Sequence, residues 1–176
     1  VDAHHDLREA YEGFTYSHAS IFYNVLNECK NVSKLIQIGI RDYSKEESQR
    51  MINLGDKGDC LYDTAMQAQI ATGKSLEEVF TPYIEQLPKN VYISIDIDGL
   101  EPLNCPNTGT PVPGGLRYGE LEHLIFMVVK SGRKIIGFDL VEVGDSKNGW
   151  DANVGSRVLY NLCGALLASQ GKIEYR

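Results

Sequence analysis

The chain alternates between short, nearly continuous apolar runs and longer stretches in which apolar residues recur every three or four positions. The runs predict buried strands, and the periodic stretches predict amphipathic helices. Strands are expected over residues 34–40, 91–97 and 134–142, and helices over residues 20–28, 45–53, 59–72, 75–86, 117–131 and 153–169. Ser75 with Glu78 three positions later predicts a capping box at the start of one helix.

This alternation predicts the fold class. Strands that are apolar along most of their length are typical of a parallel sheet covered by helices on both faces, so the chain is expected to be an α/β protein. In such folds, ligands bind outside the carboxyl ends of the strands. The sequence shows no internal repeat, low-complexity tract or linker, which indicates a single domain over residues 1–176.

Two acidic clusters stand at the ends of strand-like runs. The first holds Asp2, His4 and Asp6, and the second holds Asp96 and Asp98. Alternate residues of an extended chain project the same way, so the members of each cluster converge. Charges gathered in this way repel one another and resist desolvation, and bound divalent cations remove both costs. Five oxygen and imidazole ligands suit two Mn²⁺ ions better than a single Zn²⁺ ion.

Three further residues are interpreted from their positions. Glu142 closes the apolar run over residues 134–142, where an unpaired carboxylate would be costly to bury, and this favours a functional role. His5 has the opposite parity to the first cluster and is expected to point away from it. Cys105 lacks the spacing of a metal ligand and is expected to be a small buried residue.

Composition and charge narrow the classes of partner. The 17 basic and 24 acidic residues give a net charge of −7, which argues against nucleic-acid binding and mildly favours cationic partners. The four cysteines lack CxxC spacing and are expected to be reduced thiols of a cytoplasmic protein. A signal peptide and a membrane-spanning apolar run are both absent from this sequence, so no membrane partner is expected.

The clusters and their surroundings resemble the ureohydrolase family of arginases and agmatinases. Residues 1–6 (Val-Asp-Ala-His-His-Asp) and 94–102 (Ser-Ile-Asp-Ile-Asp-Gly-Leu-Glu-Pro) resemble its two metal signatures. Residues 106–116 resemble the loop after the second signature, and residues 140–143 resemble the last active-site strand. The resemblance implies a three-layer α/β/α sandwich with a mainly parallel sheet, two Mn²⁺ ions, and a homo-oligomer, either a trimer or a hexamer.

The resemblance also assigns metal ligands. Asp2 and Asp96 match the carboxylates that bridge the two ions, Asp6 would complete one ion, and His4 and Asp98 would complete the other. The family's first ligand is a histidine in a Gly-Gly-Asp-His segment upstream of the position of Val1. The chain is therefore predicted to be the C-terminal part of a single ureohydrolase domain, with the N-terminal strands missing.

Three residues are implied to be catalytic. Glu142 matches the acid that receives the substrate guanidinium, and His18 matches a histidine that exchanges protons with solvent. Metal-activated water attacks the guanidinium carbon, while Asp6 accepts the water proton and passes it to the departing amine. A structural role for His18, as a capping or packing residue, stays open.

The loop from Leu7 to His18 most resembles that of agmatinases, which predicts hydrolysis of agmatine, a small cationic guanidinium compound, to urea and putrescine. Glu9 or Glu12 is expected to receive the second cationic group of this substrate. Arg8 favours a substrate with a carboxylate instead, such as formiminoglutamate or guanidinobutyrate.

Alternative functions stay open. A different ureohydrolase specificity is the nearest alternative. A zinc deacetylase is disfavoured because it would use one metal and would not need Asp6 and Asp98 together. A non-catalytic fragment that lacks the first metal ligand is the alternative from another class of protein, and an upstream Gly-Gly-Asp-His segment would decide against it.

Overall fold

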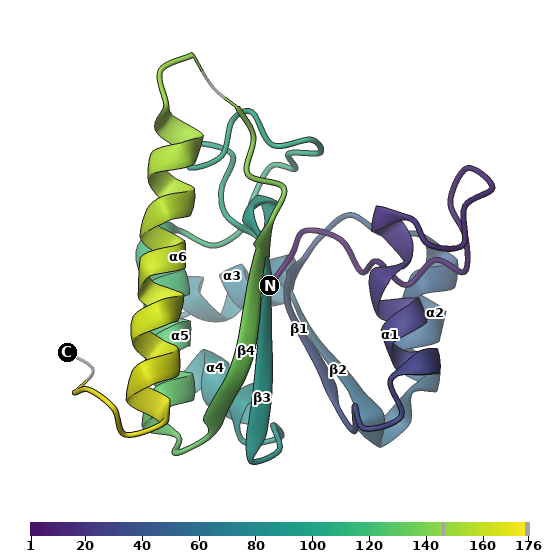
Figure 1. The fold of residues 1–176 in the computed structure, drawn as a ribbon. Coiled ribbons are helices and arrows are strands. Elements are labelled where there is room, and N and C mark those ends of the chain that lie inside the picture. Colours follow the sequence, from purple (N-terminus) through teal and green to yellow (C-terminus); the bar gives the residue numbers. More distant parts are fainter. Residues whose placement is uncertain (146, 175–176) are drawn as a thin grey trace.

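The structure is a computed structural model and describes residues 1–145 and 147–174 (Figure 1). Its strands are β1 (Leu35–Ile40), β2 (Gly58–Tyr62), β3 (Asn90–Asp96) and β4 (Lys134–Val141). Its helices are α1 (Ile21–Glu28), α2 (Lys45–Asn53), α3 (Asp63–Ala71), α4 (Leu76–Ile84), α5 (Tyr118–Lys130) and α6 (Trp150–Ser169). The predicted α/β class is confirmed.

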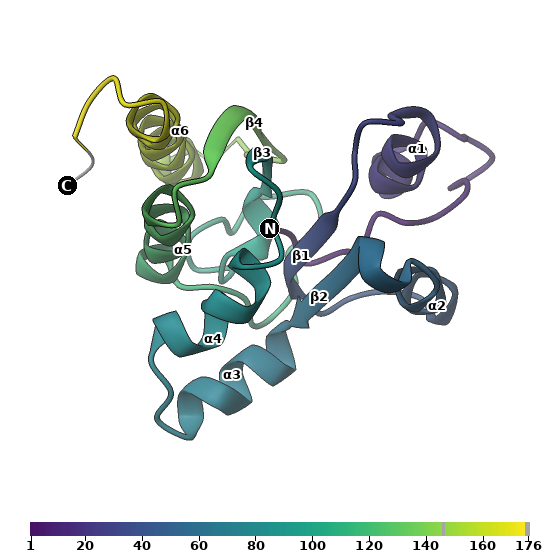
Figure 2. The same ribbon diagram turned by 90° about the horizontal axis from the view of Figure 1, so that it is seen from below.

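The strands form two parallel pairs, β1–β2 and β3–β4, and residues 1–3 run between the pairs. The amino group of Val1 donates to the Ser94 carbonyl at 2.9 Å, and the Asp2 amide donates to the Ile38 carbonyl at 3.2 Å. Seen from below, α3 to α6 lie on one side of the strands and α1 and α2 lie on the other (Figure 2). The predicted arrangement of parallel strands between two helical layers is confirmed.

The core lies between the strands and the layer that contains α4, α5 and α6. Its largest fully buried side chains include Phe80, Ile95, Leu121, Ile135 and Leu162, which come from five different elements. Burying a side chain of this size stabilises the fold by about 1.5–3 kcal/mol. This packing fixes the positions of β3 and β4, whose carboxyl ends precede Asp98 and Glu142.

Helix starts follow the local sequence. The Ser75 side chain accepts a hydrogen bond from the Glu78 amide while the Glu78 carboxylate accepts one from the Ser75 amide, so the predicted capping box is confirmed. A second box joins Ser44 and Glu47 at the start of α2. In the described part of the chain, no helix is long and apolar enough to cross a membrane.

One predicted element was wrong in part. The helix expected over residues 59–72 is two elements, because Gly58–Tyr62 forms β2 and pairs in parallel with β1. Helix α3 begins at Asp63 directly after this strand, so no loop residues separate the two patterns. Helix α6 also begins earlier than expected, at Trp150 rather than at residue 153.

Candidate metal centre

The second acidic cluster forms where β3 ends. Asp96 is the last residue of the strand, and a single 3-10 turn over Ile97–Gly99 follows it. The Asp98 amide donates to the Asp96 carboxylate at 2.9 Å, so the first aspartate shapes the turn that carries the second. The Asp98 carboxylate in turn accepts a hydrogen bond from the Ala3 amide at 3.0 Å, which joins this cluster to the N-terminal one.

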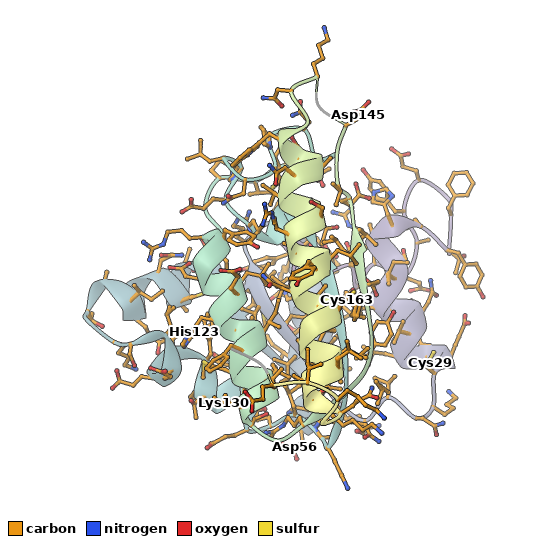
Figure 3. The ribbon with its side chains drawn as sticks, turned by 60° about the vertical axis from the view of Figure 1, so that its left-hand side comes forward. Cys29, Asp56, His123, Lys130, Asp145 and Cys163 are labelled. Carbon is orange, nitrogen blue, oxygen red and sulfur yellow. The ribbon has the colours of Figure 1, made fainter. Side chains whose placement is uncertain are left out.

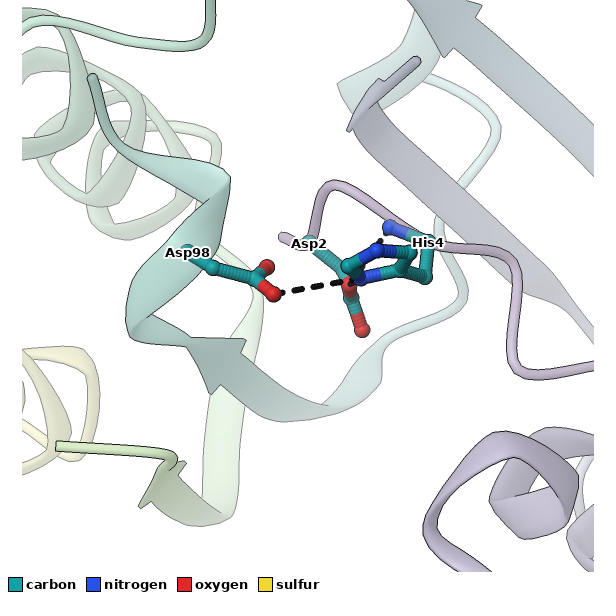
Figure 4. A group of neighbouring side chains, drawn as sticks. All are labelled: Asp2, His4 and Asp98. Carbon is teal, nitrogen blue, oxygen red and sulfur yellow. Dashed lines mark hydrogen bonds and ion pairs between the residues drawn. The ribbon is translucent and has the colours of Figure 1, made fainter. Parts of the chain in front are cut away.

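The N-terminal cluster meets Asp98 through His4 (Figure 4). The Nδ1 atom of His4 lies 3.1 Å from Oδ2 of Asp98 and 3.5 Å from Oδ1 of Asp2. One ligand atom from each of these three residues lies within 4.8 Å of the others. Residues separated by more than ninety positions in sequence therefore offer two carboxylates and an imidazole to one point.

The protein alone does not stabilise the ionised forms of all the carboxylates in the cluster. Burial, followed by the charge of Asp2, raises the pKa of Asp6 to about 8 and that of Asp96 to about 9. Hydrogen bonds with Asp2 and Asp98 raise the pKa of His4 to about 10. Burial also acts to raise the pKa of Asp98, but its hydrogen bonds with His4 and the Ala3 amide outweigh burial and lower it.

These shifts test whether the donor set fits a metal. Carboxylates that hold protons at neutral pH because they are buried together are the groups for which a divalent cation can substitute. Carboxylate oxygens with one imidazole are ligands that suit Mn²⁺. Among the described residues, the donors of Asp2, His4 and Asp98 converge and fit a hard or borderline divalent cation, whereas Asp6 and Asp96 line the adjoining pocket and are not part of this convergent group.

A pocket of about 420 Å³, which we name the strand-end pocket, opens beside this cluster. Its lining residues come from the N-terminal segment, the residues after β1, the start of α2, the end of β3, the loop after β3 and the residue after β4. They are His4, Asp6, Arg8, Tyr11, His18, Ala19, Asp42, Glu47, Asp96, Gly109, Thr110 and Glu142. All three residues predicted to be catalytic line this pocket.

Asp6 is held in an unusual conformation at the pocket. Its φ angle is +52°, in the left-handed region that few residues other than glycine adopt. The amides of Phe22 and Tyr23, in the first turn of α1, donate to the Asp6 carbonyl at 3.1 and 3.3 Å. Strained backbone that the surroundings hold in place is concentrated at functional sites, which agrees with the role expected for Asp6.

Glu142 also has a left-handed backbone, with φ +59°. The Thr108 hydroxyl donates to its carbonyl at 2.8 Å, and Gly109 lies so close that an added Cβ would stand 3.0 Å from Oε2 of Glu142. The side chain is exposed, so the expectation that this carboxylate is buried was wrong. Its place in the pocket lining, rather than a cost of burial, supports a functional role.

His18 begins a 3-10 turn over His18–Ser20 just before α1. Its ring stacks edge-on against Tyr11, with ring centroids 5.4 Å apart, and its side chain is exposed at the pocket. His5 is buried and faces away from the cluster, as expected, because its Nδ1 pairs with Oε1 of Gln37 at 2.6 Å. Cys105 is fully buried, also as expected.

Two acidic residues of the pocket were missed by sequence reasoning. Asp42 stands two residues after β1 and its Oδ2 lies 3.9 Å from Nε2 of His4, so the rule that ligands gather at strand ends would have found it. Glu47 is a capping residue of α2, and this local role gives no indication that its side chain also lines the pocket. Glu9 and Glu12, which were expected to receive a second cationic group, do not line the pocket.

The comparisons with known proteins agree with this geometry. A model of the arginase family matches residues 1–164. The chain is 34% identical over 164 residues to the N(1)-aminopropylagmatine ureohydrolase of Thermus thermophilus, covering 93% of this chain and 52% of that protein. It is 37% identical over 149 residues to the agmatinase of Halalkalibacterium halodurans, covering 81% of this chain and 45% of that protein.

A solved structure extends the likeness to the fold. The agmatine ureohydrolase of Thermoplasma volcanium aligns with 98% of this chain at a TM-score of 0.74 and 30% identity, and the match covers 54% of that chain. The fold is therefore the arginase-like α/β fold with parallel strands. The chain spans about half the length of the relatives that it matches.

Proposed function

This chain belongs to the arginase family, and we propose that it carries the centre of a binuclear manganese amidinohydrolase that converts agmatine to urea and putrescine. The observation that carries the proposal is the strand-end pocket, in which a buried acidic cluster meets Glu142 and His18. The prediction that residues 1–176 are the C-terminal part of one domain belongs to this proposal, as do the cytoplasmic location and the trimer or hexamer.

The metal ligands of the proposal are Asp2, His4, Asp6, Asp96 and Asp98, which would hold two Mn²⁺ ions. When bound, such ions lower the pKa of water, so that it becomes a nucleophile near neutral pH. The raised pKa values of Asp6 and Asp96 and the short contacts of His4 support this assignment. The Thr110 hydroxyl donates to Oδ2 of Asp98 at 3.3 Å, the same oxygen that lies 3.1 Å from Nδ1 of His4.

The remaining residues would orient the substrate and move protons. Glu142 would accept charge-assisted hydrogen bonds from the guanidinium nitrogens. Water adds to the guanidinium carbon, the bond from that carbon to the alkyl-bearing nitrogen breaks, and the products are urea and a protonated amine. Asp6 would carry the water proton to the departing nitrogen, and His18 would exchange protons with solvent at the pocket.

The charges of the pocket support a substrate with a second cationic group. Asp42 and Glu47 add negative charge beside the cluster. Arg8 has partners of its own, because its Nε lies 3.4 Å from Oε2 of Glu47 and its guanidinium stacks on Tyr11, 4.9 Å from the ring centroid. An arginine paired in this way is a poor receptor for a substrate carboxylate, so the contacts favour agmatine over guanidinobutyrate.

The test is urea release with added Mn²⁺ from agmatine, N(1)-aminopropylagmatine, arginine and guanidinobutyrate in parallel. We expect agmatine to have the highest kcat/KM, and Asp42→Asn to reduce its lead over guanidinobutyrate by about 10- to 100-fold, since one charge-assisted contact contributes roughly 1.5–3 kcal/mol. Asp56→Asn is the matched control. Asp56 lies just before the start of β2, whereas Asp42 follows the carboxyl end of the parallel strand β1, so the two aspartates lie at opposite ends of this strand pair.

Other outcomes would change the assignment. If guanidinobutyrate is the best substrate, Arg8 receives a carboxylate and the agmatine assignment is wrong. If N(1)-aminopropylagmatine is best, the pocket accepts a longer polyamine. Absence of urea from every substrate, in a protein that holds two Mn²⁺ ions, would contradict the hydrolase assignment itself.

A further inference from the structure

Arg41, which directly follows β1, lies at the centre of a network that the proposed reaction does not use. Its side chain is partly buried, and its guanidinium donates only to backbone carbonyl oxygens in the contacts described here. The acceptors belong to three separate segments of the chain. They are Gly39 at 3.1 Å, Asp98 at 2.7 Å, Leu100 at 3.2 Å, Val112 at 2.9 Å and Pro113 at 3.2 Å.

The second of these segments carries a candidate metal ligand. The Nη2 atom of Arg41 holds the carbonyl of Asp98 itself and also the carbonyl of Leu100, so it spans the turn after β3. The carboxylate of Asp98 meanwhile contacts Nδ1 of His4 at 3.1 Å and the Ala3 amide at 3.0 Å. With the backbone of Asp98 held by Arg41, its side chain has a defined direction toward His4.

The third segment, residues 110–115, is shaped to receive the guanidinium. Gly115 has φ +99°, and an added Cβ would lie 2.8 Å from Nη2 of Arg41. An added Cβ on Gly114, with φ +96°, would lie 2.6 Å from the buried carboxylate of Asp63. The same segment carries Thr110, whose hydroxyl donates to Oδ2 of Asp98 at 3.3 Å. Arg41 therefore joins the turn that carries Asp98 to the loop whose Thr110 contacts the Asp98 carboxylate.

We propose that Arg41 is a positioning residue of the metal centre, which fixes the Asp98 carboxylate by holding the carbonyls of the turn after β3 and of the loop over residues 110–115. The inference rests on the proposed metal site. A guanidinium suits this task because its five N–H donors form a rigid planar fork, whereas a lysine ammonium is a flexible point charge. Lysine keeps the charge of Arg41 but cannot hold all five carbonyls.

The test compares Arg41→Lys and Arg41→Met with a matched control, Arg133→Met. Arg133 also donates to backbone carbonyls, those of Leu87 at 2.9 Å and Glu85 at 2.8 Å, but it lies before β4 at the other end of the sheet. Two properties are measured: Mn²⁺ affinity by calorimetric titration, and amide hydrogen exchange of residues 97–116 in the metal-free protein.

We expect Arg41→Lys to weaken Mn²⁺ binding by about 10- to 100-fold, the usual effect of losing an outer contact of a metal ligand. Amide hydrogen exchange over residues 97–116 should become faster in the same variant. Arg133→Met should leave both Mn²⁺ affinity and exchange within about twofold of the wild type, because its contacts are remote from the metal ligands. Full Mn²⁺ affinity and unchanged exchange in a folded Arg41→Lys protein would overturn the proposal.

The remaining outcomes are also decisive. If circular dichroism shows that both Arg41 variants are unfolded and Arg133→Met is folded, Arg41 is a general structural residue and the proposal is wrong. If the wild-type protein binds no Mn²⁺, the proposed function fails. Faster exchange over residues 97–116 in Arg41→Lys would then still show that Arg41 orders the segment around Asp98, so the two failures are distinguishable.

Discussion

Two hollows in the surface differ in size and in the way their charges are arranged. The strand-end pocket has a volume of about 420 Å³, and a groove over α5 and α6, the α5–α6 groove, has a larger volume of about 660 Å³. The groove is lined by Glu122, His123, Tyr160 and Cys163 among others, and Figure 3 shows His123 and Cys163 on these helices. The larger hollow, the α5–α6 groove, is not the one beside which the candidate metal ligands converge.

The two hollows each contain a histidine beside carboxylates. In the pocket, Nδ1 of His4 meets Asp98 and Asp2, both buried, at 3.1 and 3.5 Å. At the groove, Nε2 of His123 lies 3.6 Å from Oε1 of Glu77, a residue of α4 outside the groove lining whose side chain is 67% exposed. The carboxylate of the second pair is open to solvent, whereas both carboxylates that contact His4 are buried. The comparison teaches that convergence of buried charge, rather than volume, identifies a site.

The largest expected effect comes from removing a buried ligand from the pocket. Asp98→Asn should weaken Mn²⁺ binding by more than about 100-fold, because losing a ligand costs more than losing an outer contact. Calorimetric titration with Mn²⁺ checks this, and His123→Asn in the α5–α6 groove is the control. Equal losses in the two variants would abolish the distinction between the hollows.

Glu142→Gln should have the next largest effect. A charge-assisted hydrogen bond contributes about 1.5–3 kcal/mol, so KM for agmatine should rise by about 10- to 100-fold. Mn²⁺ affinity should stay near that of the wild type, because Glu142 is not among the candidate ligands. Steady-state kinetics provides the measurement, with Glu122→Gln in the groove as its control. A normal KM in Glu142→Gln would remove this residue from substrate binding.

His18→Asn should reduce kcat by about tenfold with little change in KM. This is less than the roughly 10²- to 10⁴-fold of general acid–base catalysis, because solvent can replace a surface proton carrier in part. Added imidazole should restore part of the rate. If kcat is unchanged at low buffer concentration, His18 has the structural role that was left open above, as a capping or packing residue.

The metal-free protein should lose stability as pH rises. Asp6 and Asp96, whose pKa values are about 8 and about 9, keep their protons in the folded state. In the unfolded state, the same aspartates lose their protons from about pH 4 upward. The folded state thus binds more protons between about pH 4 and pH 9, and the free energy of unfolding falls across that range. In chelator, Tm should drop by about 4 °C or more from pH 5 to pH 9.

Added Mn²⁺ should reverse this pH dependence, since the ions replace the protons and bind more tightly once the carboxylates are ionised. Calorimetric melts at pH 5, 7 and 9, with chelator and with Mn²⁺, provide the measurement. A metal-free Tm that rises from pH 5 to pH 9 would contradict the electrostatic account of the cluster.

The smallest expected effect comes from Glu77, which lies on α4 outside the lining of the α5–α6 groove and contacts the groove residue His123. Glu77→Gln removes the partner of His123, and exposed ion pairs contribute at most a few tenths of a kcal/mol to about 1 kcal/mol. The free energy of unfolding, measured by urea denaturation, should change by about 0.5 kcal/mol or less. A loss above about 2 kcal/mol would mean that the groove also holds a buried, cooperative charge network.

Much of the architecture could be predicted because strands and helices each produce a characteristic spacing of apolar residues in the sequence. Helix α2 was expected at its observed bounds, and the capping box at Ser75 is a local pattern. Strand β2 was missed because five residues pair with β1 and then pass directly into α3. A strand of this length has too few residues for a clear period, and only its pairing with β1 identifies it as a strand.

The site divides in the same way. Asp2, His4 and Asp6 could be selected as one group because alternate residues share a face, and the same holds for Asp96 and Asp98. Asp42 was missed because it stands alone after β1, and Glu47 because its capping role explains it locally. Its place after a predicted strand could have identified Asp42, whereas Glu47 carries no further signal that sequence reasoning can detect.

By itself, the sequence determined most of the strands and helices, β2 excepted, and that carboxylates and imidazoles stand at two strand ends. Both follow from interactions within a few residues. Only the tertiary structure decided that Asp98 faces His4, that Glu142 stands exposed in the pocket, and that Arg41 holds three segments together. Such contacts join residues far apart in the chain, and their geometry depends on how the layers pack around the strands.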